Sequence, residues 1–188
     1  MYDRQAARAN NRLKPLLDAG AREFAKHGYS GTTTRAIAAA ASMTPGAIYA
    51  HFPSKQALLL AVYELGVDRA TEAVDEAVRL HAEPWERLEA VVAAHLRTIL
   101  DQSDYARVMT QVMPEHVEGV ADELRALRER YEERFRALIP SLQLPTQTDL
   151  RLFRLLLLGA INWTPVWYRQ GYGNVDDVAH AFVAMLRR

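Results

Sequence analysis

Apolar residues recur every three or four positions along most of the 188-residue chain, a spacing that places them on one face of successive α-helices. No stretch keeps the alternation of period two that indicates a β-strand. Glycine and proline gather at a few points, where they would end the helices. The sequence therefore predicts an all-α fold of about nine helices. We expect them at residues 11–27, 34–41, 45–52, 55–80, 84–102, 104–114, 117–138, 147–170 and 175–188.

Residues that commonly begin and end helices mark the borders of the first four. Gly28 follows the first predicted helix, where a left-handed C-cap is common. Residues 32–34 are three threonines whose hydroxyls can cap the second helix. Pro45 can occupy the first turn of the third helix without losing a hydrogen bond, and Ser54 can cap the fourth.

Residues 28–59 contain two short predicted helices joined by a tight turn, which is the plan of a helix-turn-helix. A small apolar core can form from Ile37, Ala38, Ala41, Met43, Ile48 and Phe52. The outer face of the second short helix then presents Thr44, Pro45, Ala47, Tyr49, Ala50 and His51. Residues 28–59 are therefore predicted to lie in a small N-terminal domain, the head, that has one polar face.

The charge of the chain is divided unevenly, although it sums to zero. Residues 1–60 carry eight basic and three acidic residues, while the remainder carries fifteen basic and twenty acidic ones. No carboxylate occurs in the 40 residues between Glu23 and Glu64. A basic N-terminal segment on an acidic remainder, with no acid in its helix-turn-helix, favours a polyanionic partner such as nucleic acid, with chance in a short segment as the alternative.

The head also carries a linear motif that is more specific than a helix-turn-helix pattern. Its parts are Gly28-Tyr29, Thr32-Thr33-Thr34, Ile37-Ala38, the run from Gly46 to Phe52, and Ser54-Lys55. Over about 45 residues and without gaps, these motifs resemble the DNA-binding domain of the TetR family of transcriptional regulators. Ser42 stands where the family usually has glycine, and Pro45 and Ala47 replace more polar recognition residues.

The resemblance implies a helix-turn-helix DNA-binding domain over residues 1–55 and a helical ligand-binding and dimerisation domain over 56–188. In the first, Thr34, Tyr49, His51 and Lys55 would contact phosphates, and Arg35 a phosphate or a base. Base edges would face Thr44, Pro45, Ala47 and Ala50. The full expected DNA-binding set is Thr33, Thr34, Arg35, Thr44, Pro45, Gly46, Ala47, Tyr49, Ala50, His51 and Lys55. Tyr49 and His51 could instead be packing residues, and Lys55 could be a solvated residue at a helix start.

The C-terminal part has more large apolar residues than one buried stripe needs. The resemblance implies that its last two helices pack against their copies in a homodimer, and a surplus of apolar surface fits such burial. The expected interface residues are Leu155, Gly159, Trp163, Trp167, Phe182 and Leu186. The alternative is a fully buried central helix in a monomer.

Residues 159–163 and 167–169 also resemble a branch of the family that responds to acyl-CoA thioesters. The expected effector contacts are Tyr105, Met109, Met113, Asn162 and Trp163. Core packing is the alternative for the apolar stripe over 105–113, and a bond across the dimer interface is the alternative for Asn162. The arginines and glutamates of 125–136 suggest a solvated helix with i,i+4 pairs.

Several functions are excluded by what the sequence lacks. The chain has no cysteine, its histidines lack metal-ligand spacing, and it has no phosphate-binding or nucleophile motif. We therefore expect no catalytic residues, no metal and no cofactor. We also expect no membrane span and no secretory signal, and hence a cytoplasmic protein. The predicted function is a dimeric repressor that binds a pseudo-palindromic double-stranded DNA operator and is released by a small-molecule effector. The alternative is a helical protein-interaction module without DNA binding.

Overall fold

The structure, a computed structural model, describes residues 2–169, 171 and 173–187. Every regular element among these residues is a helix, which confirms the all-α prediction. The first elements are α1 (Tyr2–Gly31), α2 (Thr34–Ala40), α3 (Pro45–Tyr49), α4 (Lys55–Arg79), α5 (Pro84–Leu100) and α6 (Asp104–Gln111). The remaining elements are η1 (Pro114–His116), α7 (Ala121–Leu138), η2 (Ile139–Leu142), α8 (Leu150–Asn162), α9 (Thr164–Trp167) and α10 (Val175–Leu186). The ends predicted at residues 170 and 188 lie outside the described residues.

The chain forms two compact units. The first consists of Met1–Val67 with Ser103–Leu127, and the second of Asp68–Gln102 with Arg128–Arg188. The helices α4 and α7 each contribute residues to both units.

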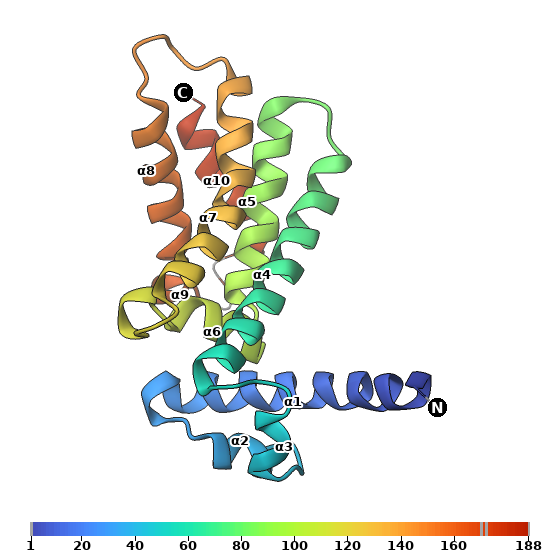
Figure 1. The fold of residues 1–188 in the computed structure, drawn as a ribbon. Coiled ribbons are helices and arrows are strands. Elements are labelled where there is room, and N and C mark those ends of the chain that lie inside the picture. The colour runs from blue at the N-terminus through green and yellow to red at the C-terminus, as the bar shows by residue number, and fades with distance from the viewer. Residues whose placement is uncertain (1, 170, 172, 188) are drawn as a thin grey trace. The chain divides into compact units, whose positions relative to one another are not determined.

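In the first unit, α2 and α3 pack beneath α1 (Figure 1). Ile37 and Ile48 are buried, one from each short helix, and α1 and α4 add further buried residues. These are Leu16, Phe24, Leu58 and Leu59. Burying the apolar face of each short helix in this shared core is what keeps helices of seven and five residues folded.

The helix α6 belongs to the same unit and packs along α1. The hydroxyl of Tyr105 donates to Oδ1 of Asp18 at 2.9 Å, and Nη2 of Arg107 donates to the carbonyl of Ala25 at 3.0 Å. The glycine at position 66 of α4 lets Met109 approach closely, since a Cβ there would lie 2.7 Å from the sulfur of that methionine. The first unit is therefore larger than the three-helix head.

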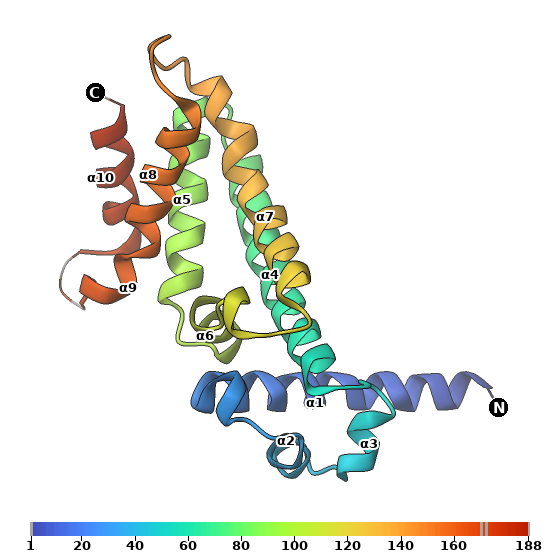
Figure 2. The ribbon, with the colours of Figure 1, turned by 60° about the vertical axis from the view of Figure 1, so that its left-hand side comes forward.

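In the second unit, α5 lies at the centre, with α10 and α8 beside it (Figure 2). Six consecutive residues, 91–96, are buried, so this part of α5 is covered on every side. Opposing helices contribute Phe135, Leu157 and Val183 to the same core. The central helix of this unit is thus α5 and not the apolar α8.

Several boundaries differ from the predictions, among them those of α1, expected over 11–27 and observed over Tyr2–Gly31, and two of the differences have clear physical reasons. The helix predicted over 147–170 is broken at Trp163, because Pro165 has no N–H and its ring would clash with the carbonyl of residue 161 in a continuous helix. The helix predicted from Val117 begins at Ala121, since the intervening Gly119 has φ of 86°. No helix in the described part of the chain is both long and apolar enough to cross a membrane.

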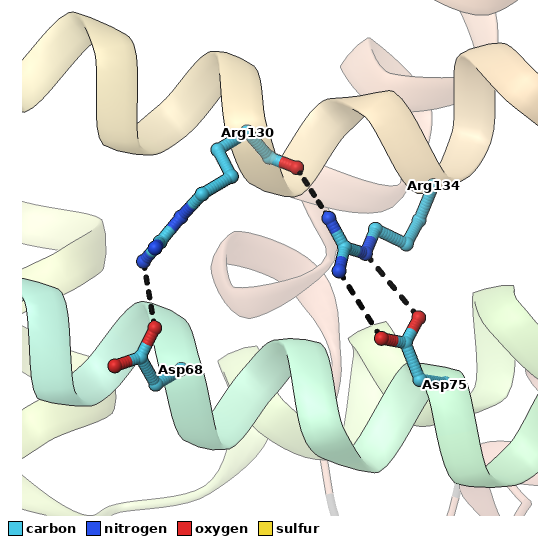
Figure 3. A network of polar contacts seen from close by, with 4 residues as sticks. All are labelled: Asp68, Asp75, Arg130 and Arg134. Carbon is cyan, nitrogen blue, oxygen red and sulfur yellow. Dashed lines mark hydrogen bonds and ion pairs between the residues drawn. The ribbon is translucent and has the colours of Figure 1, made fainter.

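The arginines of α7 pair differently from the prediction. Arg130 reaches Asp68 of α4 at 2.6 Å, and Arg134 binds both carboxylate oxygens of Asp75 at 3.1 and 3.2 Å (Figure 3). The intrahelical pairs described for α7 have i,i+3 spacing, as in Arg136 with Glu133. The i,i+4 ion pairs expected for Arg130, Arg134 and Arg136 are therefore not the pairs observed, although these side chains stay 30–52% exposed, as on a solvated helix.

Candidate nucleic-acid interface

The turn between α2 and α3 is a Schellman motif, in which the chain leaves a helix through one left-handed residue. The N–H of Met43 donates to the carbonyl of Ala38 at 2.8 Å, and the N–H of Ser42 donates to that of Ala39 at 3.1 Å. Ser42 is the left-handed residue, with φ of 55°. This conformation explains why a glycine is expected at this position, as the comparison with the family motif indicated.

The helix α3 begins as the sequence predicts. Thr44 is its N-cap, and its hydroxyl accepts from the N–H of Ala47 at 3.2 Å, while Pro45 occupies the first turn. Thr33 caps α2 in the same way by accepting from Ala36 at 3.1 Å. These caps satisfy N–H groups that a short helix leaves free, and they fix the direction in which both helices leave the loops.

The expected DNA-binding side chains lie together on α2, α3 and the adjoining residues, and none of them is buried. The exposed ones are Thr33, Arg35, Thr44, Pro45, Gly46, Tyr49 and Ala50, and the half-buried ones are Thr34, Ala47, His51 and Lys55. The buried residue of α3 is Ile48, on the opposite side of that helix. No carboxylate occurs in residues 24–63, so none of these elements adds an acid to the exposed side chains.

Two hydroxyls on this face lie close together. The Tyr49 hydroxyl lies 3.3 Å from that of Thr34, and the tyrosine is 53% exposed. An exposed hydroxyl pair that joins α2 to α3 can donate to a phosphate oxygen, as Tyr and Thr commonly do. The exposure of Tyr49 also argues against its alternative as a packing residue.

Lys55 has a structural contact that the sequence did not reveal. Its Nζ donates to the carbonyls of Tyr29 at 2.9 Å and Thr32 at 2.8 Å, and it lies 4.2 Å from the centre of the Tyr29 ring. Burial raises the pKa of Tyr29. Since an ammonium has three N–H groups, one remains for a phosphate. Lys55 therefore fixes the loop between α1 and α2, and its predicted DNA contact remains a prediction.

Thr32 fixes the same loop from the other side. Its hydroxyl lies 2.7 Å from the carbonyl of Gly28 and 3.0 Å from that of Glu23. Gly28 interrupts the helical backbone of α1 with positive φ, as expected of a glycine there, but its φ of 69° and ψ of 173° are not those of the predicted left-handed C-cap. The run of threonines predicted only N-caps. The carbonyls that Thr32 contacts could not be predicted, because they come close to it only in the folded loop.

The second unit contains a polar triad that joins two buried residues, His95 and Tyr131, to Asn162 at the surface. His95 of α5 is buried, and its Nε2 lies 3.0 Å from Oδ1 of Asn162 while its Nδ1 lies 2.9 Å from the hydroxyl of Tyr131. An amide oxygen only accepts, so Nε2–H donates to Asn162 and the Tyr131 hydroxyl donates to Nδ1. Burial lowers the pKa of His95 to about 4, opposed by the bond to Asn162. Burial also raises the pKa of Tyr131, and Arg134 opposes it.

The residues expected to bind an effector are not all in one unit. Tyr105, Met109 and Met113 belong to the first, and Asn162 and Trp163 to the second. Tyr105 is buried and hydrogen bonded within its unit, while Trp163 is 63% exposed. The assignment of these five residues to an effector remains a prediction. No group of three potential metal ligands occurs among the described residues.

An apolar face runs along α8, α9 and α10. It includes the expected interface residues Leu155, Gly159 and Trp163, which are exposed, and Trp167, Phe182 and Leu186, which are half-buried. Further exposed members are Leu152, Leu156, Val166 and Met185. The rings of Trp167 and Phe182 meet edge to face, 6.2 Å apart. The exposure of this face in a single chain excludes the alternative of a fully buried central α8.

The helix-turn-helix and the helical second unit define a DNA-binding regulator with a separate helical domain. The family model for bacterial regulatory proteins of the tetR family matches residues 16–62. The model for the tetracyclin repressor-like C-terminal domain matches residues 81–188. The chain belongs to the TetR family.

The relatives include a named repressor in two organisms. The HTH-type transcriptional repressor KstR2 of Rhodococcus jostii (strain RHA1) is 30% identical, over 94% of this chain and 90% of that protein. KstR2 of Mycobacterium tuberculosis (strain CDC 1551 / Oshkosh) is also 30% identical, but the match spans 62% of each protein.

Solved structures have the same fold. The superantigen PfiT is 26% identical with a TM-score of 0.82, over 93% of this chain and 95% of that one. The structure of AibR in complex with isovaleryl coenzyme A and operator DNA is 24% identical with a TM-score of 0.79, over 93% of this chain and 97% of that one. The second likeness shows the fold alone.

Proposed function

We propose that this protein is a transcriptional repressor that binds a pseudo-palindromic operator as a homodimer and leaves it when a small-molecule effector binds. The observation that carries the proposal is the outer face of α2 and α3, where the expected DNA contacts are accessible and carboxylates are absent. A phosphate lattice attracts such a face and repels acids. Membership of a regulator family with named repressors supports the same function.

Operator binding gives the direct test, using the DNA upstream of the protein's own gene and fluorescence anisotropy. Tyr49→Phe removes only the exposed hydroxyl, and we expect it to weaken binding roughly five- to tenfold, the value of one lost hydrogen bond. Ser30→Ala removes an exposed hydroxyl outside the face and serves as the matched control. Affinity should fall steeply with salt, because bound phosphates release counterions. Salt-independent binding, or no binding, would favour the protein-interaction module.

The homodimer is proposed to form through the apolar face of α8, α9 and α10. Two head domains about one DNA turn apart, ~34–36 Å, would then read two half-sites. Leu156→Glu places a charge on this face and should shift the protein to monomers in sedimentation velocity. Leu80→Glu is the control, since Leu80 is an exposed leucine elsewhere in the second unit. A monomeric wild type would contradict the proposal.

The effector is proposed to be an acyl-CoA thioester or a related acyl compound. The resemblance of residues 159–163 and 167–169 to acyl-CoA-responsive regulators supports this class, as does the structure of AibR, which has a similar fold, in complex with isovaleryl coenzyme A. A ligand releases the operator only to the extent that it prefers the released conformation. Thermal-shift measurements with a series of acyl-CoA esters test the class, and no stabilisation by any of them would exclude it.

A further inference from the structure

The second unit contains a cleft of about 430 Å³ that is lined by α4, α5, α7 and η2. Four charged residues line it: Asp75, Arg87, Glu133 and Arg134. Its volume lies within the range of small-molecule sites. The four charged residues differ in whether they have a partner of opposite charge.

Three of the four charged residues have partners. Arg134 binds both oxygens of Asp75 through Nε and Nη2 (Figure 3). Glu133 accepts from Nη1 of Arg136 at 2.6 Å. The Nε of Arg87, in contrast, is buried and has no hydrogen-bond partner among the described residues. Arg87 therefore lines the cleft as a cation with no ion pair or side-chain hydrogen bond to another described residue.

The chemistry of a guanidinium restricts what could bind to it. Its planar fork of N–H groups matches the oxygens of a carboxylate or a phosphate. The remaining lining includes the apolar side chains of Val78, Ala137 and Leu138. A ligand that suits both parts combines an anionic group with a hydrocarbon portion.

We propose that this cleft binds an amphipathic organic anion, with its carboxylate or phosphate oxygens on Arg87 and its apolar part along Val78, Ala137 and Leu138. The anionic group can come from a free acid or from the coenzyme A part of a thioester. An anion in this cleft also competes with Asp75 for Arg134, because both arginines line it. Asp75 lies on α4, the helix that begins at Lys55 beside the DNA interface. This last step, release of the operator through α4, rests on the proposed function.

Isothermal titration of the full chain without DNA tests the site directly. The probes are octanoate, octanoyl-CoA, coenzyme A and octanol. We expect octanoate or octanoyl-CoA to bind one site per chain, and Arg87→Met to weaken this at least tenfold. Arg151→Met is the matched control, because Arg151 is an exposed arginine of the same unit outside the cleft. The unfolding midpoint of unliganded Arg87→Met should equal or exceed that of wild type, since a buried unpaired donor is removed.

Each outcome has a defined meaning. Octanoate binding that depends on Arg87 supports a free acid as the source, and binding of octanoyl-CoA alone supports the thioester. If octanol binds as tightly as octanoate, the cleft does not recognise the negative charge of the ligand. If coenzyme A binds as tightly as octanoyl-CoA, the apolar side chains of the cleft do not bind the hydrocarbon portion. Equal affinity in Arg87→Met, or a lowered midpoint, would overturn the site. Anion binding that leaves operator affinity unchanged would overturn only the step through α4. Failure of the proposed function is distinguishable from these outcomes, because the protein would then not bind the operator even when no ligand is present.

Discussion

The hydrogen bonds that shape the helix-turn-helix of the first unit join residues close together in the sequence. The polar contacts in the second unit join residues that are far apart in the sequence. The caps of Thr33 and Thr44 each span three residues, and the turn at Ser42 uses carbonyls three to five residues back. In the second unit, His95 contacts residues 36 and 67 positions away. The local contacts form wherever the motif occurs, whereas the distant ones exist only after the unit has packed.

This difference predicts where a substitution or a change of pH acts most strongly. Local caps stabilise by small increments that solvent can partly replace. A buried group such as His95 has no access to water, so a change in its charge is opposed by the whole core. We therefore expect the effect of a change to decrease from buried His95 to the exposed turn at Ser42.

The largest effect is expected on acidification, through His95. Its pKa in the folded protein is about 4, below the usual 6.5, so the unfolded chain binds a proton that the folded protein excludes. The stabilising contribution of neutral His95 is complete above pH 6.5 and is lost as the pH falls toward 4. The loss corresponds to about 3 kcal/mol at 1.36 kcal/mol for each pKa step. Urea unfolding at pH 7.5 and pH 4 measures it.

His95→Gln provides the comparison for that experiment, because glutamine can hydrogen bond but does not titrate in this range. Carboxylates lower the stability of both proteins in acid, so the relevant quantity is the difference between them. The variant should lose about 3 kcal/mol less than wild type between the two pH values. Equal losses of stability in the two proteins would show that folded His95 takes up a proton over the same pH range as it does in the unfolded chain.

A smaller loss is expected for Lys55→Met, which removes two hydrogen bonds from a charged donor to the loop before α2. We expect the free energy of unfolding to fall by about 2 kcal/mol. Lys26→Met is the control, because Lys26 is an exposed lysine of α1. Chemical denaturation compares the two variants with wild type.

The same variant distinguishes the two roles of Lys55 in DNA binding. If its third N–H binds a phosphate, the slope of log affinity against log salt should become shallower by about one. If Lys55 acts only on the loop, affinity falls while the slope is unchanged. Wild-type stability in Lys55→Met would contradict the loop contact itself.

The Asp75 and Arg134 pair should contribute less, although it also joins residues far apart in the chain. Half of the Asp75 side chain is exposed, and solvent screens such a pair. Asp75→Asn should therefore lower the free energy of unfolding by roughly 0.5–1 kcal/mol. Glu76→Gln removes a neighbouring exposed carboxylate of α4 and should have a smaller effect. A double-mutant cycle with Arg134→Gln isolates the pair, and zero coupling energy would exclude a contribution.

The range of the contacts also explains how much the sequence could predict. The all-α class, the caps at Thr33 and Ser54, and the outer face of α3 depend on neighbouring residues and were predicted, whereas the N-cap role of Thr44 was not. The role of Thr32, the loop contact of Lys55 and the triad at His95 require knowledge of which segments meet. The spacing of apolar residues along the sequence does not reveal which segments meet. The break at Trp163 was missed for another reason, because the apolar period continued through Thr164-Pro165 and obscured the proline.

The smallest effect is expected at Ser42, and its direction is opposite to that of the others. Ser42 has φ of 55°, a region that disfavours a side chain with a Cβ, so Ser42→Gly relieves strain in the folded turn. Glycine also gives the unfolded chain more freedom, which offsets part of the gain and leaves about 0.5 kcal/mol of stabilisation. Ser30→Gly, at an exposed position of α1 without positive φ, should destabilise instead. Denaturation midpoints of both variants test this. If Ser42→Gly lowers the midpoint as Ser30→Gly does, the turn is not left-handed at Ser42, and the Schellman motif that orients α3 is absent.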